Sequence, residues 1–256
     1  VIFQVSGAIS IALGGYLYLM HPTFPYIVSG VFSLIGVITS FLFVEPKIKR
    51  ERFKLQPFIK KNAAGFVEIF KNSQIARLTI LFSLLLGIAN VNQQFFVQPY
   101  MLELGMSDLE RSWVAMGIKI GIALIGAYVM SLKRISKSRY FLFVIPLIMI
   151  ASLLPASIVT LPVAYILFVG IAFTSGNTNL FFSPEYNRHI DSKVRSTAVS
   201  AQKMIASFVG AVVQWISAPI VAAQSVGVFY SYLGIFTLVI LIPLTWSVFR
   251  QQTRSL

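Results

Sequence analysis

Long runs of apolar residues, separated by short polar connections, set the hydropathy pattern of the chain. A helix needs roughly 20 apolar residues to cross a bilayer core about 30 Å thick. Eight runs approach that length, at residues 1–20, 26–44, 77–101, 112–132, 140–158, 162–183, 197–221 and 227–248. They are too long for strands and lack the period-two alternation of a membrane barrel. The pattern therefore predicts an all-α integral membrane protein with eight transmembrane helices.

The composition agrees with a chain whose surroundings are mostly lipid. Of its 256 residues, 57% are hydrophobic and 11% are charged, whereas about 25% of the residues of a soluble domain carry a charge. The sequence contains no cysteine, which excludes disulfides, thiol catalysis and Cys-based metal sites. No charged segment precedes the first run, so it does not resemble a signal peptide. We expect the chain to begin part-way through a longer protein.

The net charge of +13 follows the expected topology. If the eight helices alternate in direction, every Lys and Arg except Arg111 and Lys119 lies on one side of the membrane. Such an excess of basic residues marks the cytoplasmic side. We therefore expect a multi-pass protein of the cell membrane, with the connection at 45–76 and the C-terminus in the cytoplasm. The basic residues form no patch, so we expect no nucleic-acid partner.

The connection at 45–76 is the one long connection between the runs. Within it, Phe58, Phe66 and Phe70 alternate with lysines in a pattern that suits a short amphipathic helix on the inner membrane surface. A plain tether between two helical halves explains the segment equally well.

Polar side chains divide the spans into two kinds. Asparagine, glutamine or lysine occurs well inside the third, fourth, sixth and seventh spans, whereas the second, fifth and eighth contain none of them. Polar groups in hydrocarbon are costly unless they face a bundle interior or a wet cavity. We therefore expect the polar spans to line a cavity and the apolar spans to pack outside them. The order polar, polar, apolar occurs twice, which is typical of transporters built from three-helix repeats.

Four segments resemble the major facilitator superfamily of transporters. They are "FLFVEPK" at 41–47, "NQQFFVQPYMLELGMS" at 92–107, "LKRISKSR" at 132–139 and "PEYNRHIDSKVRSTAVS" at 184–200. They resemble, in order, the exit of the sixth helix, the seventh helix with its outer loop, a degenerate copy of the basic interhelix motif, and the loop between the tenth and eleventh helices. The third lacks the customary Gly-Asp-Arg core. The order and spacing of the segments carry the resemblance, which covers essentially the whole chain.

The resemblance implies a secondary active transporter that lacks its first four helices. Residues 1–44 would be the last two helices of a truncated N-terminal bundle, 45–76 the loop between bundles, 77–248 a complete six-helix C-terminal bundle and 249–256 a cytoplasmic tail. Two bundles that rock about a midplane site would expose it alternately to the two sides. The partners would be a small-molecule substrate, the bilayer and the missing helices. We expect that this chain alone does not transport.

The seventh span carries a row of small and polar residues with helical spacing. Ser196, Ser200, Lys203, Ser207, Gly210, Gln214 and Ser217 follow one another at intervals of three and four, which places them on one face. The row is either a cavity wall or a small-residue packing seam. The size of Gln214 favours the wall, so Ser207 and Gln214 are substrate-cavity candidates.

The third span carries a second row, with four amides in its centre. The row consists of Ser83, Gly87, Asn90, Gln94 and Gln98, with Gln93 alongside. Substrate-cavity lining and interhelical hydrogen bonds are the two explanations, and the number of amides favours lining for Asn90, Gln93 and Gln94. In the sixth span, Asn177 shares a face with Thr174 and Phe181 and is a weaker candidate.

Lys119 is a basic residue inside a span. It lies about 10 Å, at 1.5 Å per residue, below the outer end of its helix, so its side chain could extend to the outer interface instead. Its face is otherwise small, with Ser112, Ala115, Ala123 and Gly126. This small face favours a position in the cavity over the outer interface. Because the eight spans contain no acid, the cation would bind an anionic substrate group or pair with a carboxylate of the missing half.

Arg188, Asp191 and Arg195 lie at the inner mouth and are candidates for a cytoplasmic gate. Asp191 and Arg195 are four residues apart and could pair at a helix start. A solvated loop is the plainer explanation.

Other function classes find little support. The chain has two histidines, on opposite sides, no carboxylate pair within a span and no Gly-rich phosphate loop. We therefore expect no enzyme activity, no cofactor and no metal site. A transporter-like sensor or receptor without flux and a non-functional fragment remain as alternatives.

Overall fold

The computed structural model describes residues 2–43, 55–131, 140–192 and 194–254, and every regular element within those ranges is a helix. The helices are α1 (Ile2–Met20), α2 (Phe24–Ser40), α3 (Leu55–Lys71), α4 (Ser73–Val91), η1 (Asn92–Phe96), α5 (Val97–Glu103), α6 (Asp108–Ser131), α8 (Phe141–Leu153), α9 (Leu161–Arg188), α10 (Arg195–Ala223) and α11 (Val226–Arg254). Residues 44–54, which include most of the segment at 41–47 and the start of the long connection, lie outside the described residues, as do the segment at 132–139 and residue 193.

Five helices of the described part are long and apolar enough to cross a membrane, by length and composition. They are Ser73–Glu103, which joins α4, η1 and α5, then Asp108–Val129, Leu161–Arg188, Arg195–Ala223 and Val226–Arg250. Three shorter apolar helices cover Ser6–Met20, Phe24–Ser40 and Phe141–Leu153. The predicted all-α membrane architecture is confirmed, and each of the eight predicted runs coincides with a helix. The count of eight crossings stays a prediction, because three of these helices are short.

Local hydrogen bonds fix the helix ends. The side chain of Asn72 accepts a bond of 2.8 Å from the Gln74 N–H and so starts α4 directly after α3. At the start of α6, the Ser107 N–H donates to the Glu110 carboxylate at 2.8 Å, and the Glu110 N–H donates to the Ser107 hydroxyl at 3.4 Å. This reciprocal pair is a capping box. Between α5 and α6 the chain turns at Gly105, whose φ of 86° is accessible to glycine at little cost.

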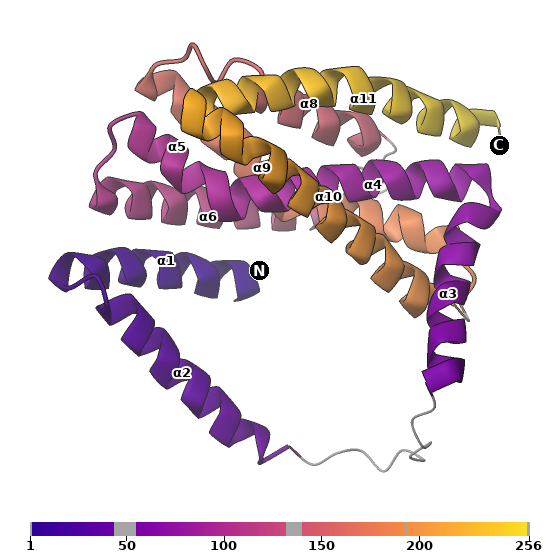
Figure 1. Cartoon of the computed structure of the whole chain (residues 1–256), viewed down its shortest axis with the longest axis horizontal. Coiled ribbons are helices and arrows are strands. Elements are labelled where there is room, and N and C mark those ends of the chain that lie inside the picture. Colours follow the sequence, from indigo (N-terminus) through magenta and orange to yellow (C-terminus); the bar gives the residue numbers. More distant parts are fainter. Residues whose placement is uncertain (1, 44–54, 132–139, 193, 255–256) are drawn as a thin grey trace.

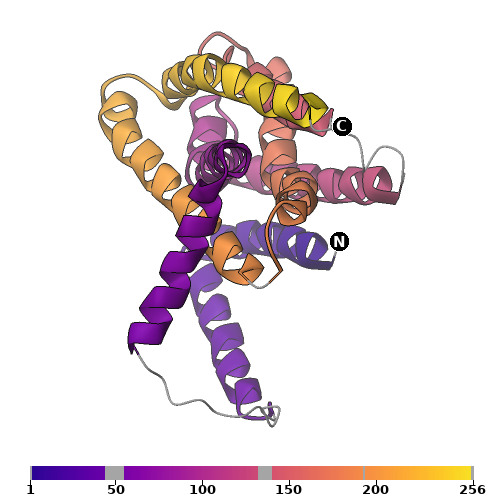
Figure 2. The same cartoon turned by 90° about the vertical axis from the view of Figure 1, so that its right-hand side faces the viewer.

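Helix α4 occupies the centre of the molecule and packs against α9, α10 and α11 (Figures 1 and 2). It approaches α10 closely through glycine, because a Cβ atom on Gly87 would lie 2.5 Å from the Ala206 carbonyl oxygen. Against α9 it packs aromatic rings, with the centroid of Phe82 lying 5.5 Å from that of Phe182 and 5.9 Å from that of Tyr186. These contacts pack α4 closely between its neighbours.

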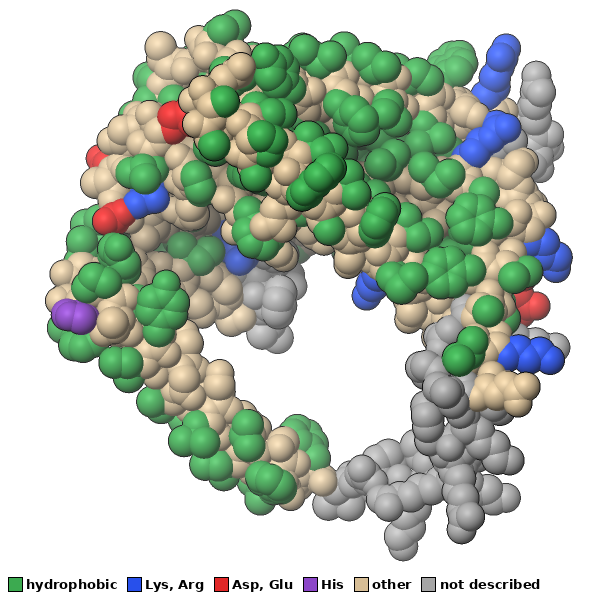
Figure 3. Space-filling view, viewed as in Figure 1, with side chains coloured by type: hydrophobic (Ala, Val, Ile, Leu, Met, Phe, Trp, Pro, Cys, Tyr) green, Lys and Arg blue, Asp and Glu red, His purple; other side chains and the backbone are tan. Residues whose placement is uncertain are grey.

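Helices α1 and α2 form a hairpin that extends from the rest of the molecule (Figure 1). The hairpin touches the main body where α1 packs along α6. Helices α1 and α6 lie so close that a Cβ atom on Gly15 of α1 would overlap the side chain of Ser112 of α6. Helix α2 contains no buried residue, and apolar side chains cover its length (Figure 3).

Helix α3 lies at the end of the molecule that also holds the C-terminus and turns sharply from α4 (Figure 1). Its Gly65 packs against Thr197 at the start of α10, and Ile69 is fully buried. Residues 55–71 of the long connection are therefore helical and dock onto α10. The side chain of Phe58 lies outside the described part.

Candidate functional site

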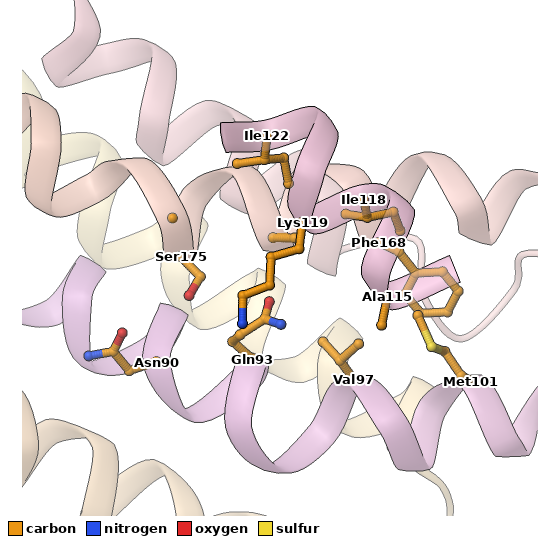
Figure 4. Close-up of a pocket in the computed structure, with 12 residues that line it drawn as sticks. Asn90, Gln93, Val97, Met101, Ala115, Ile118, Lys119, Ile122, Phe168 and Ser175 are labelled. Carbon is orange, nitrogen blue, oxygen red and sulfur yellow. The ribbon is translucent and has the colours of Figure 1, made fainter. Parts of the chain in front are cut away.

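A cavity of about 240 Å³ opens between the α4–η1–α5 rod, α6 and α9 (Figure 4). It is lined by Asn90, Gln93, Val97, Met101, Ala115, Ile118, Lys119, Ile122, Phe168, Ala172, Ser175 and Gly176. Its walls thus come from three of the helices that the sequence analysis expected to line a cavity. Helix α10, the fourth, contributes no side chain to it.

The π-helical segment η1 lies at the middle of this cavity. Its defining bond runs from the Val97 N–H to the carbonyl oxygen of Asn92, one residue further apart than in an α-helix. The residues of the rod that line the cavity nevertheless follow one another at intervals of three and four, as on one face of an α-helix. In the structure Asn90, Gln93, Val97 and Met101 line the cavity, whereas Gln94 is exposed.

Lys119 extends from α6 toward Gln93, so that its ammonium lies among the polar side chains of the cavity (Figure 4). The Lys119 side chain also lies against α1, because a Cβ atom on Gly7 would be 3.0 Å from Nζ and 3.3 Å from Cε. Within the described residues, no salt bridge joins Lys119 to an acid. The absence of a side chain at Gly7 therefore leaves the space that the ammonium occupies.

The amide of Gln93 contributes an unsatisfied hydrogen-bonding group. Its Oε1 atom is buried and has no hydrogen-bond partner. A buried polar atom without a partner costs about 1–3 kcal/mol relative to a satisfied one. A ligand that supplies a hydrogen-bond donor at this place would recover that free energy.

The structure brings together three of the seven predicted cavity residues, namely Asn90, Gln93 and Lys119. Asn177 is buried outside this cavity, donates to the carbonyl oxygen of Phe173 at 3.1 Å and contacts α6 at Gly126. Gln94 is exposed.

Ser207 and Gln214 are likewise exposed on α10 and do not line the cavity. Their predicted row divides between two environments, because Gly210 is buried against Val91 of α4 and Ser217 is also buried. One side of the row is thus a packing seam, and the other side is open.

The three gate candidates lie together at the end of α9 and the start of α10. Arg188 pairs with Glu185 at 3.1 Å, and Arg195 donates to the carbonyl oxygen of Ile190 at 3.4 Å. Asp191 is exposed in the turn between them. The neighbouring His189 connects this turn to α4, since its Nε2 lies 3.5 Å from the amide nitrogen of Gln74.

Several cavity residues carry no distinctive signal in the sequence. Ser175, Phe168 and Met101 belong to residue types that are common in any membrane helix, so their place in the wall follows only from the packing. Ser175 lies two residues before Asn177, so the polar stretch around Asn177 is the signal that could have identified it as a cavity residue.

The sequence analysis also missed Gln202 of α10. It is 1% exposed, and Ser83 donates to its carbonyl oxygen at 3.2 Å.

A comparison with known protein families identifies the family of the chain. The family model of the major facilitator superfamily matches residues 1–214. The chain belongs to the major facilitator superfamily. No match was found among curated proteins or among solved structures.

Membership in this superfamily of transporters, together with the apolar helices, makes the chain a multi-pass membrane protein. Its surroundings are the lipid bilayer, and its class of cargo is a small molecule. The family is generally not enzymatic. The resemblance read from the sequence is therefore confirmed.

Proposed function

We propose that the chain is part of a secondary active transporter that binds its cargo in the cavity between α4–η1–α5, α6 and α9 and moves it by alternating access. The observation that carries the proposal is the convergence of Asn90, Gln93 and Lys119 on one cavity inside an otherwise apolar bundle. Polar groups at this depth persist where they serve a ligand or each other. Binding near the middle of the membrane, at discontinuous helices, suits this class of transporter.

The arrangement of the helices supports a two-bundle scaffold with eight crossings in this chain. The α1–α2 hairpin would belong to one bundle and α4 to α11 to the other, with the contact between α1 and α6 as part of their interface. The exposed residues Ser207 and Gln214 of α10 would face further helices of the first bundle. The transport pathway would then lie between the bundles, and this chain alone would not complete it.

The distribution of charge supports the proposed orientation. Lys and Arg side chains gather at the end of the molecule that carries α3 and the C-terminus (Figure 3). Basic residues accumulate on the cytoplasmic side of membrane proteins. Arg188, Asp191 and Arg195 belong to this end and would form the inner gate, where the contact between His189 and Gln74 ties α9 to α4.

The contact between α1 and Lys119 suggests how rocking would reach the cargo. Gly7 of α1 lies against the Lys119 side chain, so a shift of α1 along α6 would uncover or cover the ammonium. Such small displacements of packed helices are a common form of domain motion.

Counterflow into proteoliposomes that hold the purified intact protein tests the proposal. The vesicles are preloaded with a metabolite extract, exposed to the same extract with isotope label, and analysed by mass spectrometry. We expect time-dependent accumulation of at least one labelled compound over protein-free vesicles. Binding of compounds to the protein without accumulation of any of them would favour a sensor built on the same scaffold and would contradict the proposal.

A further inference from the structure

The cavity is divided into a polar end and an apolar end. Asn90, Gln93, Ser175 and the ammonium of Lys119 lie at one end, whereas Val97, Met101 and the ring of Phe168 lie at the other (Figure 4). A ligand that fills such a space has a compact polar group and an apolar body. A uniformly polar cargo, such as a sugar, would leave hydroxyl groups against the apolar wall without partners.

The polar end carries a positive charge that its walls do not neutralise. Lys119 is the charged member of the twelve lining residues, and among the described residues no salt bridge involves it. A cation surrounded by apolar helices is unfavourable until a negative charge approaches it. Asn90, Gln93 and Ser175 add N–H and O–H donors around the same place, and donors suit an anion.

We propose that the cargo is a small organic anion, with a carboxylate between Lys119 and the amides and an aliphatic or aromatic body toward Phe168 and Met101. This assignment rests on the proposed function, because it places the cargo in the same cavity. The buried Oε1 of Gln93, which has no partner, adds a place for a donor group of the ligand. The volume of about 240 Å³ fits a single metabolite-sized acid.

Matched pairs of acids and neutral amides test the charge requirement on the purified intact protein. Phenylacetate is compared with phenylacetamide, hexanoate with hexanamide, and phenethylamine serves as the cation. Binding is measured as a shift in Tm over a range of ligand concentrations, because a ligand that binds the folded state raises Tm. We expect the acids to raise Tm and the amides and the amine to have at least tenfold weaker effects. Equal shifts for acid and amide, or no shift with either acid, would overturn the proposal.

Variants of Lys119 test the place of the anion. In Lys119→Met the apparent Kd for phenylacetate should rise about ten- to hundredfold, because a charge-assisted hydrogen bond is lost. Lys119→Arg should retain part of the affinity. Lys71→Met removes one positive charge from the exposed surface of α3 and should leave the Kd unchanged. Unchanged phenylacetate binding by a folded Lys119→Met protein would overturn the assignment of the site.

Flux measurements separate this proposal from the proposed function. Accumulation of neutral or cationic compounds, with anions excluded, would keep the transporter and overturn the anionic cargo. Anion binding that depends on Lys119, without flux of any compound, would keep the anion site and overturn the transporter.

Discussion

At the scale of single residues, the cavity depends on which of several neighbouring amides turns inward. Gln93 lines the cavity, whereas Gln94 is exposed, although the two residues adjoin in the chain. The sequence identified both as candidates because it shows only that polar groups lie deep in a span. Gln93 and Gln94 follow Asn90 by three and four residues, so helical spacing alone does not choose between them. Three site residues were therefore predictable from their chemistry, and their selection among others was not.

The two neighbouring glutamines give a matched pair of variants. Gln93→Ala should raise the KM for flux about fivefold, because one hydrogen bond to the cargo contributes about 1 kcal/mol. Gln94→Ala should change KM by less than about twofold, since the side chain lies outside the cavity. Initial rates of uptake into proteoliposomes measure both. A larger effect from Gln94→Ala than from Gln93→Ala would contradict the placement of the two side chains.

At the scale of helices, the sequence predicted the elements well and their close contacts poorly. Each apolar run coincides with a helix, and five of these helices are long enough to cross a membrane, since burial in lipid demands a length that the sequence displays directly. The observed helix ends differ from the predicted ends where side chains cap the helix. Helix α6, for example, begins at Asp108 because Ser107 and Glu110 cap it. Helix α1 packs on α6 where Gly15 leaves room for the side chain of Ser112, and a hydropathy pattern does not indicate such a contact.

Two adjacent glycines of α1 test its contact with α6. Gly15→Val should lower the Tm of the purified intact protein by several degrees, because overpacking a close contact costs about 1–3 kcal/mol. A Cβ atom on Gly15 would overlap Ser112, whereas one on Gly14 has no heavy atom within 4 Å. Gly14→Val should therefore leave Tm nearly unchanged. Equal losses in the two variants would show that α1 does not pack on α6 through Gly15.

At the scale of the whole molecule, exposed apolar surface and charge asymmetry define its surroundings. Phe32 of α2 is 69% exposed and Trp215 of α10 is 79% exposed, and such surface suits lipid or further helices rather than water. The sequence predicted this membrane class from its apolar runs and its composition. It did not predict which helices enclose the cavity, because α10, although polar along one row, stands outside it.

The absence of cysteine makes the orientation directly measurable. Ser192→Cys lies in the turn between α9 and α10, and Thr160→Cys lies in the turn before α9. In intact cells, a membrane-impermeant maleimide should label the Thr160→Cys protein and should label the Ser192→Cys protein only after permeabilisation. The reverse pattern would contradict a cytoplasmic C-terminus.

The central claim is that cargo occupies the cavity beside Lys119, and protection of a single thiol tests it most directly. Ser175 lines the cavity on α9, and Ser131 is exposed at the end of α6. Ser175→Cys and Ser131→Cys proteins react with N-ethylmaleimide in membranes with and without the compound that counterflow identifies as cargo. The account predicts that cargo slows labelling of the Ser175→Cys thiol several-fold and leaves that of the Ser131→Cys thiol unchanged. Equal rates at the Ser175→Cys thiol with and without saturating cargo would contradict it.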